Sequence, residues 1–158
     1  MMKNKYEKAL ELMSESDPNI KRVIHLLEES VEEGNSEASY ALATWYLHGT
    51  NLSKNINKGA ALLNNAADTN HPDACFDLAI CYEKGAGVSQ SFEKAFELYL
   101  RAALYGDKQS FCEVGRCYYY GIGIGVDKII ADIWYEKAES LGVEGIGFEG
   151  EFEDGIYP

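Results

Sequence analysis

The stretch from Gly121 to Val126 reads Gly-Ile-Gly-Ile-Gly-Val and is the part of the sequence most similar to a phosphate-binding loop. In nucleotide-binding proteins such glycines follow a β-strand, and their backbone amides surround a phosphate where a helix begins. Here the residues before Gly121 are typical of a helix, and a related stretch follows Gly85. We therefore interpret both stretches as turns between helices and expect no nucleotide or other cofactor.

The three histidines, His25, His48 and His71, are not placed like metal ligands, because no two of them are spaced i, i+4. We expect His25 at the edge of a core, His71 in a turn, and His48 as the histidine able to contact a partner. Asp73 and Asp77 are four residues apart, which is typical of a solvated helix face. No Ser/His/Asp or Cys/His arrangement is visible in the order of residues. The sequence therefore predicts neither a metal site nor a catalytic site.

The four cysteines are placed unfavourably for disulfides. Cys75 and Cys81 lie on one predicted helix, about 9 Å apart along its axis at 1.5 Å per residue. Cys112 and Cys117 are about 7.5 Å apart on the same measure. Neither pair easily reaches bridging geometry. We expect all four to be reduced and to serve as small core or boundary residues.

The elements that position these residues follow an internal repeat. Alanine 38 and alanine 74 occupy equivalent positions, since 74 − 38 = 36, and the same step relates many other residues. In one half of the unit, Ala38-Leu42-Ala43-Tyr46-Gly49 becomes Ala74-Leu78-Ala79-Tyr82-Gly85 and then Ser110-Val114-Gly115-Tyr118-Gly121. In the other half, the equivalent sets are Leu26, Leu62, Leu98, Trp134 and Gly34, Asn70, Gly106, Gly142. A fixed period of this length predicts an array whose units bury their apolar faces against their neighbours.

Each unit is expected to be a pair of antiparallel helices. In the third unit the pattern predicts a helix over 73–84, with a proline in its first turn, and a second helix capped by Ser91 that runs to about Tyr105. We therefore predict an all-α fold, an α-solenoid of about four units at 1–34, 35–70, 71–106 and 107–142, the first of them degenerate. Residues 143–158 break the period.

The spacing and the signature together resemble the Sel-one-like repeat family, which is related to the tetratricopeptide repeats. The third unit supplies the residues that carry this resemblance: Ala74, Leu78-Ala79, Tyr82, Gly85-Ala86-Gly87-Val88, Lys94-Ala95, Tyr99, Ala102-Ala103 and Gly106. The resemblance covers residues 20–142 and implies an α-solenoid adaptor for protein–protein interaction, without catalysis. Some secreted relatives bridge their repeats through paired cysteines. Cys75 lies near such a position but Ala67 stands about where its partner would be.

One arc of each first helix differs between units, whereas the core positions repeat. The relationship to tetratricopeptide repeats implies that this arc lines a concave groove. The groove would then combine aromatic and aliphatic side chains with acids. Aromatic anchors contribute much of the affinity at interfaces, and acids select basic partners. The candidate partner-binding residues are Glu37, Tyr40, Thr44, His48, Asp73, Phe76, Asp77, Ile80, Lys84, Glu113, Arg116 and Tyr120. The bland alternative is that the aromatics pack on neighbouring helices and that Asp77 and Glu113 are simply solvated.

The formal net charge of −12 speaks against nucleic acid and against anionic membranes as partners. It fits a protein partner with a basic or mixed basic and apolar surface, although such a charge also simply keeps a repeat protein in solution. No apolar run approaches the length of a membrane span, and residues 1–8 are unlike a secretory signal. We therefore expect a cytoplasmic protein.

The tail at 143–158 combines five acids and no base with apolar side chains that include Phe148, Phe152, Ile156 and Tyr157. One interpretation is a cap over the last helix pair. The other is a linear motif that docks elsewhere.

The sequence thus favours a non-enzymatic scaffold or adaptor that binds a protein in its groove. A more specific alternative is an acidic immunity or antitoxin-like inhibitor of a basic toxin or effector. A third is a regulator or an enzyme with an unrecognised site in the groove.

Overall fold

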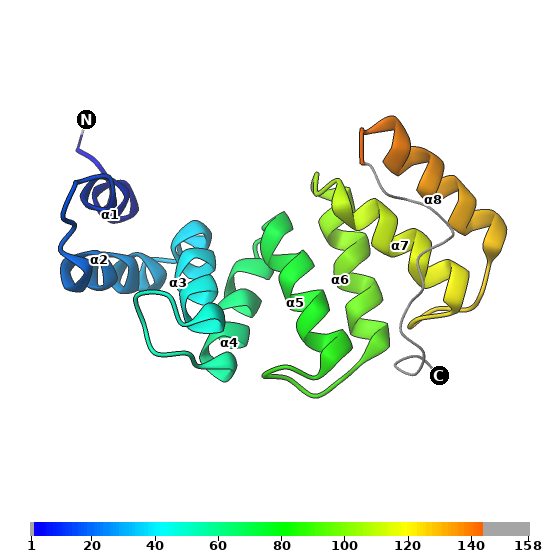
Figure 1. Ribbon diagram of the computed structural model, residues 1–158, viewed down its shortest axis with the longest axis horizontal. Coiled ribbons are helices and arrows are strands. Elements are labelled where there is room, and N and C mark those ends of the chain that lie inside the picture. The colour runs from blue at the N-terminus through cyan, green and yellow to red at the C-terminus, as the bar shows by residue number, and fades with distance from the viewer. Residues whose placement is uncertain (1, 144–158) are drawn as a thin grey trace.

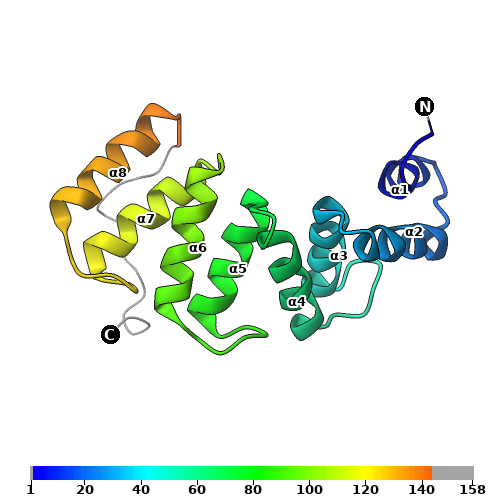
Figure 2. The same ribbon diagram turned by 180° about the vertical axis from the view of Figure 1, so that it is seen from behind.

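The computed structural model describes residues 2–143. These residues form eight α-helices and no strand, which confirms the predicted all-α class. The helices are α1 (Lys5–Met13), α2 (Ile20–Glu32), α3 (Ser36–His48), α4 (Ile56–Ala67), α5 (Pro72–Lys84), α6 (Phe92–Leu104), α7 (Gln109–Tyr120) and α8 (Lys128–Ser140). They follow one another along an arc, with α1 and α8 at its opposite ends (Figures 1 and 2).

The helices pack as neighbouring pairs. The closest packing is within α3–α4, α5–α6 and α7–α8, and α1 packs on α2 in the same way. Successive pairs meet through α2–α3, α4–α5 and α6–α7. Each pair therefore rests mainly on the pairs next to it in the chain, which confirms the predicted solenoid with a period of about 36 residues.

Local signals set the ends of the helices as the sequence predicts. Pro72 stands in the first turn of α5, and Gly85 ends that helix with a φ of 66°. The Ser91 side chain accepts a hydrogen bond from the backbone N–H of Lys94 and so caps α6. Asn70 adopts a φ of 61° in the turn before α5, a conformation that asparagine tolerates better than most residues.

The turn inside each of the last three pairs is closed by an equivalent backbone hydrogen bond. The residue that caps the second helix donates its N–H to a tyrosine carbonyl near the end of the first helix. The pairs are Asn55 to Tyr46 at 2.8 Å, Ser91 to Tyr82 at 3.0 Å and Asp127 to Tyr118 at 2.9 Å. These bonds hold the two helices of the last three pairs in a similar relation, so equivalent positions in these pairs point the same way.

The glycine-rich stretches are needed for close packing. A Cβ atom added to Gly123 would lie 2.0 Å from the carbonyl oxygen of Phe92, and one added to Gly87 would lie 2.7 Å from that of Ile56. Both glycines also have positive φ, 68° and 72°. Each loop therefore rests against the start of the second helix of the preceding pair. At the equivalent position in the α3–α4 loop, Asn51 carries a side chain at a φ of 58°.

Small residues form much of the core. Ala38, Ala43, Ala74 and Ala79 are fully buried, as their repeating positions predict, and one cluster extends from α3 to the α7–α8 pair. A second cluster joins α1, α2 and α3. Alanine at these positions lets the helix axes approach closely. A side chain on one helix can therefore contact the neighbouring helix.

All four cysteines are free thiols, as predicted. Cys75, Cys81 and Cys117 are buried and Cys112 is half-buried. Burial raises the pKa of Cys117 to about 12 and that of Cys112 to about 11. These thiols are therefore packing groups, because the reactive form is the thiolate.

Of the predicted tail, only Val143 lies among the described residues. The role of the tail at 143–158 as a cap or as a docking segment stays a prediction. The limits of the individual units also stay a prediction.

Candidate functional site

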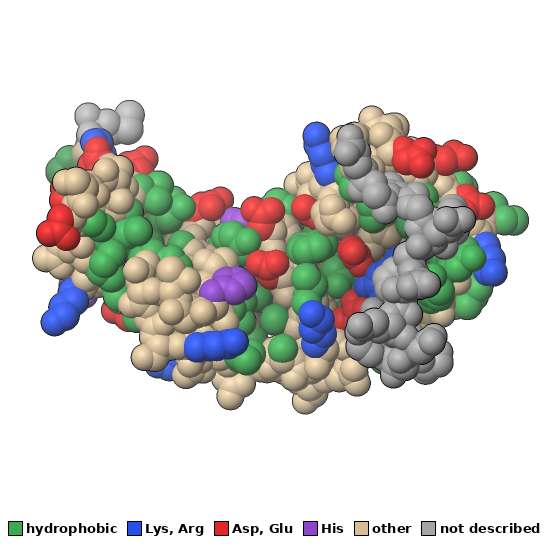
Figure 3. All heavy atoms as spheres, in the orientation of Figure 1, with side chains coloured by type: hydrophobic (Ala, Val, Ile, Leu, Met, Phe, Trp, Pro, Cys, Tyr) green, Lys and Arg blue, Asp and Glu red, His purple; other side chains and the backbone are tan. Residues whose placement is uncertain are grey.

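The twelve candidate residues all lie on α3, α5 and α7, the first helices of the second, third and fourth pairs. We call the outward side of these three helices the A-helix face. Figure 3 shows that the upper edge of the array is hollowed between its two ends, and that acidic side chains gather along this edge and over the middle of the face. Helices α3, α5 and α7 each contribute candidate residues to this face.

The candidates differ in how far they are exposed. Glu37, Asp73, His48 and Lys84 are exposed, and Tyr120 is 44% exposed. Thr44, Phe76, Ile80, Tyr40, Asp77 and Glu113 are half-buried. Phe76 packs edge-on against the Tyr99 ring at 5.7 Å between centroids, and the Thr44 hydroxyl donates to the Ala41 carbonyl at 2.8 Å. Part of the predicted surface is thus already used for packing. This agrees with the alternative prediction that the aromatic residues pack on neighbouring helices.

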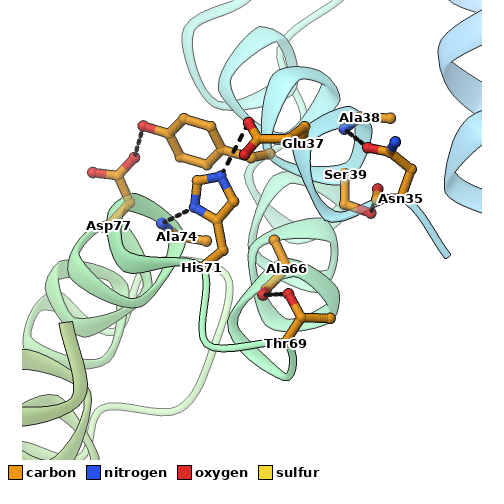
Figure 4. Close-up of polar contacts among 10 residues, drawn as sticks. Asn35, Glu37, Ala38, Ser39, Ala66, Thr69, His71, Ala74 and Asp77 are labelled. Carbon is orange, nitrogen blue, oxygen red and sulfur yellow. Dashed lines mark hydrogen bonds and ion pairs between the residues drawn. The ribbon is translucent and has the colours of Figure 1, made fainter. Parts of the chain in front are cut away.

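A polar cluster links α3 to α5 on this face. The Tyr40 hydroxyl donates to Asp77 Oδ2 at 3.1 Å, and the Tyr40 ring stacks on His71 with 4.8 Å between centroids (Figure 4). His71 Nε2 lies 3.3 Å from Glu37 Oε2. Asp77 is therefore not simply solvated, because a phenol from the neighbouring pair holds it in place.

His71 has a larger role than the predicted turn residue. Its Nδ1 accepts the backbone N–H of Ala74 at 3.3 Å, so His71 is the N-cap of α5, and its side chain is only 7% exposed. Because Nδ1 accepts, the ring proton of the neutral form is on Nε2, which faces Glu37. The sequence signal was available: His71 is equivalent to the capping residue Asn35, one period earlier.

Burial dominates the electrostatics of this cluster. Burial raises the pKa of Asp77, and the hydrogen bond from Tyr40 lowers it in part. The nearby Asp73 and Asp107 carboxylates raise it further. Burial and the Asp77 charge likewise raise the pKa of Tyr40, so the phenol stays protonated and remains a donor.

A second polar cluster joins α5, α6 and α7 and is buried. Glu83 Oε2 accepts from Arg116 Nη2 at 2.8 Å and from the Tyr99 hydroxyl at 2.9 Å. Arg116 Nε also donates to Glu113 Oε2 at 2.7 Å. Glu83 and Arg116 are 7% and 8% exposed. Burial alone lowers the pKa of Arg116, but its bonds to the two carboxylates outweigh this and hold the pKa above the usual value.

The second cluster corrects the prediction for Arg116. The guanidinium does not point into solvent, because Glu83 and Glu113 hold it inside the protein, and we leave it out of the partner-binding surface. Glu113 is likewise an ion-pair partner, not a solvated acid. Sequence reasoning missed Glu83 and Tyr99. The available signal was a matched change, since Glu83 and Arg116 stand one period after Leu47 and Ile80.

Within residues 2–143, no group of three or more His, Cys, Asp or Glu side chains is arranged to hold a metal ion. No helix of the same residues combines the length and apolarity that a membrane crossing requires.

The paired helices and their recurring contacts define a helical repeat protein. A sequence profile of the Sel1 repeat matches residues 36–71, 72–107 and 112–143. These matches cover more than half of the chain, and the chain belongs to the Sel1 repeat family. Proteins of this family generally act as non-enzymatic scaffolds that bind other proteins.

Three solved structures share the fold. A Sel1 repeat protein from Oxalobacter formigenes has a TM-score of 0.83 at 23% identity, over 88% of this chain and 56% of that protein. A protective antigen of uropathogenic Escherichia coli that displays an SLR fold has a TM-score of 0.81 at 22% identity, over 87% of this chain and 30% of that protein. An immunity protein from Pseudomonas aeruginosa has a TM-score of 0.57 at 21% identity, over 87% of this chain and 52% of that protein. Curated proteins yield no match.

Proposed function

We propose that this chain is a non-enzymatic adaptor that binds another protein across the A-helix face. One observation supports the proposal: the core positions repeat and are buried, whereas most positions of the A-helix face differ from unit to unit and several of them are exposed. Ala38 and Ala74 illustrate the first class, and the equivalent residues His48 and Lys84 illustrate the second. A repeat that only had to fold would not need three different surfaces on three equivalent helices.

The chemistry of this face favours a partner with basic and apolar groups. Glu37 and Asp73 are exposed acids of this face, and Tyr120 is a partly exposed aromatic side chain. The net charge of −12 adds a long-range attraction for cationic proteins, and it opposes binding to nucleic acid or anionic membranes. Four free thiols suit a reducing compartment, and we place the protein in the cytoplasm.

A narrower form of this proposal is an acidic immunity protein that neutralises a basic toxin or effector. The charge favours it, and one of the proteins that share the fold is named an immunity protein. This form predicts that one cationic partner is captured and that its toxicity is suppressed.

Affinity purification from the native organism, followed by mass spectrometry, supplies the partner for the test. The double variant Glu37→Lys/Asp73→Lys should then bind that partner at least ten-fold more weakly, and binding of the parent should weaken as salt rises. The matched control is Glu28→Lys/Glu97→Lys, which changes the net charge equally at exposed acids of α2 and α6. Equal losses in both double variants, or no loss in either, would rule out the A-helix face as the binding surface.

A further inference from the structure

An exposed apolar patch lies on the first turns of α8 and on the loop just before this helix. Its residues are Val126 (62% exposed), Ile129 (77%) and Ile133 (59%), and we call them the α8 patch. The equivalent residues one period earlier are Gln90, Glu93 and Glu97, which are exposed and polar. Contiguous exposed apolar side chains are uncommon on a soluble surface and often mark a binding site.

At neighbouring positions of the same two helices the difference is reversed: the residues are apolar on α6 and polar on α8. In α6, Phe96 is buried and packs edge-on against the Tyr118 ring of α7 at 5.4 Å, and Leu100 joins the same core. Their equivalents on α8 are Asp132 and Glu136, which are exposed. Helix α8 is therefore polar where α6 packs on the following pair, and apolar where α6 meets water.

Two occupants of the α8 patch are excluded, one by these residue exchanges and the other by the net charge. A further repeat stacked like its predecessors would bury Asp132 and Glu136 and leave the patch uncovered, because Glu93 and Glu97 stay exposed although a helix pair follows α6. An anionic membrane is repelled by the net charge of −12.

A second copy of the chain fits poorly as well. Two copies carry the same large negative charge. The occupant must therefore bring opposite charge together with apolar side chains.

We propose that the α8 patch is a second docking surface that takes a basic amphipathic helix of a partner protein. Ile129 and Ile133 form an apolar stripe one helical turn long that ends at the exposed Lys137, and each isoleucine is followed three residues later by an exposed acid, Asp132 and Glu136. Two parallel stripes, one apolar and one acidic, complement a helix that carries leucine-like residues beside Lys or Arg. The chain then has two separate binding surfaces, the A-helix face and the α8 patch, and can connect two proteins.

The test uses two synthetic helical peptides as probes, with the same leucine stripe flanked by Lys in one and by Glu in the other. Titration of ¹⁵N-labelled full-length protein with the Lys peptide should shift amide signals within 126–137. Ile129→Glu/Ile133→Glu, which gives α8 the residues found at 93 and 97, should weaken binding at least ten-fold. Asp132→Asn/Glu136→Gln should weaken it several-fold and reduce its salt dependence.

The matched control is Glu93→Gln/Glu97→Gln, which removes two acids from the equivalent positions of α6 and should leave the Kd unchanged. The milder pair Ile129→Ser/Ile133→Ser replaces the Glu pair if circular dichroism shows altered melting. The proposal is overturned by absent shifts at millimolar peptide, by equal binding of the Glu peptide, or by shifts confined to α3, α5 and α7. It is also overturned if sedimentation reveals a dimer that Ile129→Glu/Ile133→Glu dissociates, or if the peptide binds only after residues 144–158 are removed.

Discussion

Two junctions of the array use equivalent positions for different purposes. Between the second and third pairs, Tyr40 on α3 reaches Asp77 on α5 in a half-buried contact. Between the third and fourth pairs, Glu83 on α5 reaches Arg116 on α7 in a buried contact. The contact positions of the two junctions are one period apart. Tyr40 and Asp77 of the earlier junction correspond to Phe76 and Glu113 of the later one. Glu83 and Arg116 of the later junction correspond to Leu47 and Ile80 of the earlier one.

The comparison shows that the repeat period determines which positions contact one another, whereas the side chains at those positions determine how exposed the contact is. Leu47 and Ile80 join the apolar core of the earlier junction, and two charges with a tyrosine replace them at the later one. A buried charge pair is costly to break and cheap to replace by apolar groups of similar size. The A-helix face is therefore open near Glu37 and Asp77 and closed around Arg116.

The largest expected effect comes from breaking the buried cluster. Arg116→Ala leaves the Glu83 carboxylate buried without the guanidinium and should lower the free energy of unfolding by about 3 to 5 kcal/mol. Chemical denaturation followed by circular dichroism measures this change. A loss below about 1 kcal/mol, the range of surface ion pairs, would contradict the burial of this contact.

The sharper form of this experiment rebuilds one junction as the other. Glu83→Leu, Tyr99→Leu and Arg116→Ile together install the residues found at 47, 63 and 80. The triple variant should recover most of the stability that Arg116→Ala loses, because apolar side chains of suitable size replace buried ion pairs at little cost. Failure to recover would mean that the two junctions differ in backbone geometry as well as in side chains.

The loops within the helix pairs offer the next largest effect. Gly123→Ala places a Cβ against the Phe92 carbonyl at a φ of 68° and should cost about 2 to 3 kcal/mol. Asn51→Ala, at the equivalent loop position of the second pair, should cost about 1 kcal/mol, since it only removes a residue that tolerates positive φ. Thermal unfolding of both variants makes the comparison, and equal shifts in Tm would show that the close approach at Gly123 is relaxed in solution.

The sequence predicts the fold because the fold depends on residues that repeat. Alanines, loop glycines and capping residues recur at one spacing, so each unit confirms the interpretation of the others. The polar clusters were predicted poorly because each occurs once. Helical periodicity places Arg116 on the arc that is expected to line the groove and bind a partner, and periodicity cannot show that Glu83 and Tyr99 reach across to bury it. The matched replacement of Leu47 and Ile80 was the one sequence signal of this contact.

A smaller effect is expected at the half-buried junction. Tyr40→Phe removes the donor to Asp77 while keeping the ring that stacks on His71, and should lower the free energy of unfolding by about 1 kcal/mol. Phenylalanine already stands at the equivalent position 76, so the side chain fits. Tyr105→Phe is the control, because Tyr105 is 56% exposed and its loss should be close to zero. Equal values for the two variants would show that the Tyr40 hydrogen bond adds nothing to stability.

The smallest effect is a pH dependence at the same junction. Burial raises the pKa of Asp77 above its ordinary value of 3.8, so the folded protein holds that proton more tightly than the unfolded chain does. The resulting stabilisation is fully present below pH 3.8 and is lost as the pH rises through the pKa of the folded state. Asp77→Asn cannot titrate, so the parent should lose stability relative to this variant across that window.

Tyr40→Phe sharpens the pH experiment. The Tyr40 hydrogen bond lowers the pKa of Asp77 and opposes the effect of burial, so its removal should raise that pKa further and move the window to higher pH. NMR titration of the Asp77 carboxyl carbon in both proteins measures the shift. If the parent instead gains stability over Asp77→Asn as the pH rises, the phenol outweighs burial, and the half-buried junction behaves like the buried one, where bonds to charged partners dominate the pKa of Arg116.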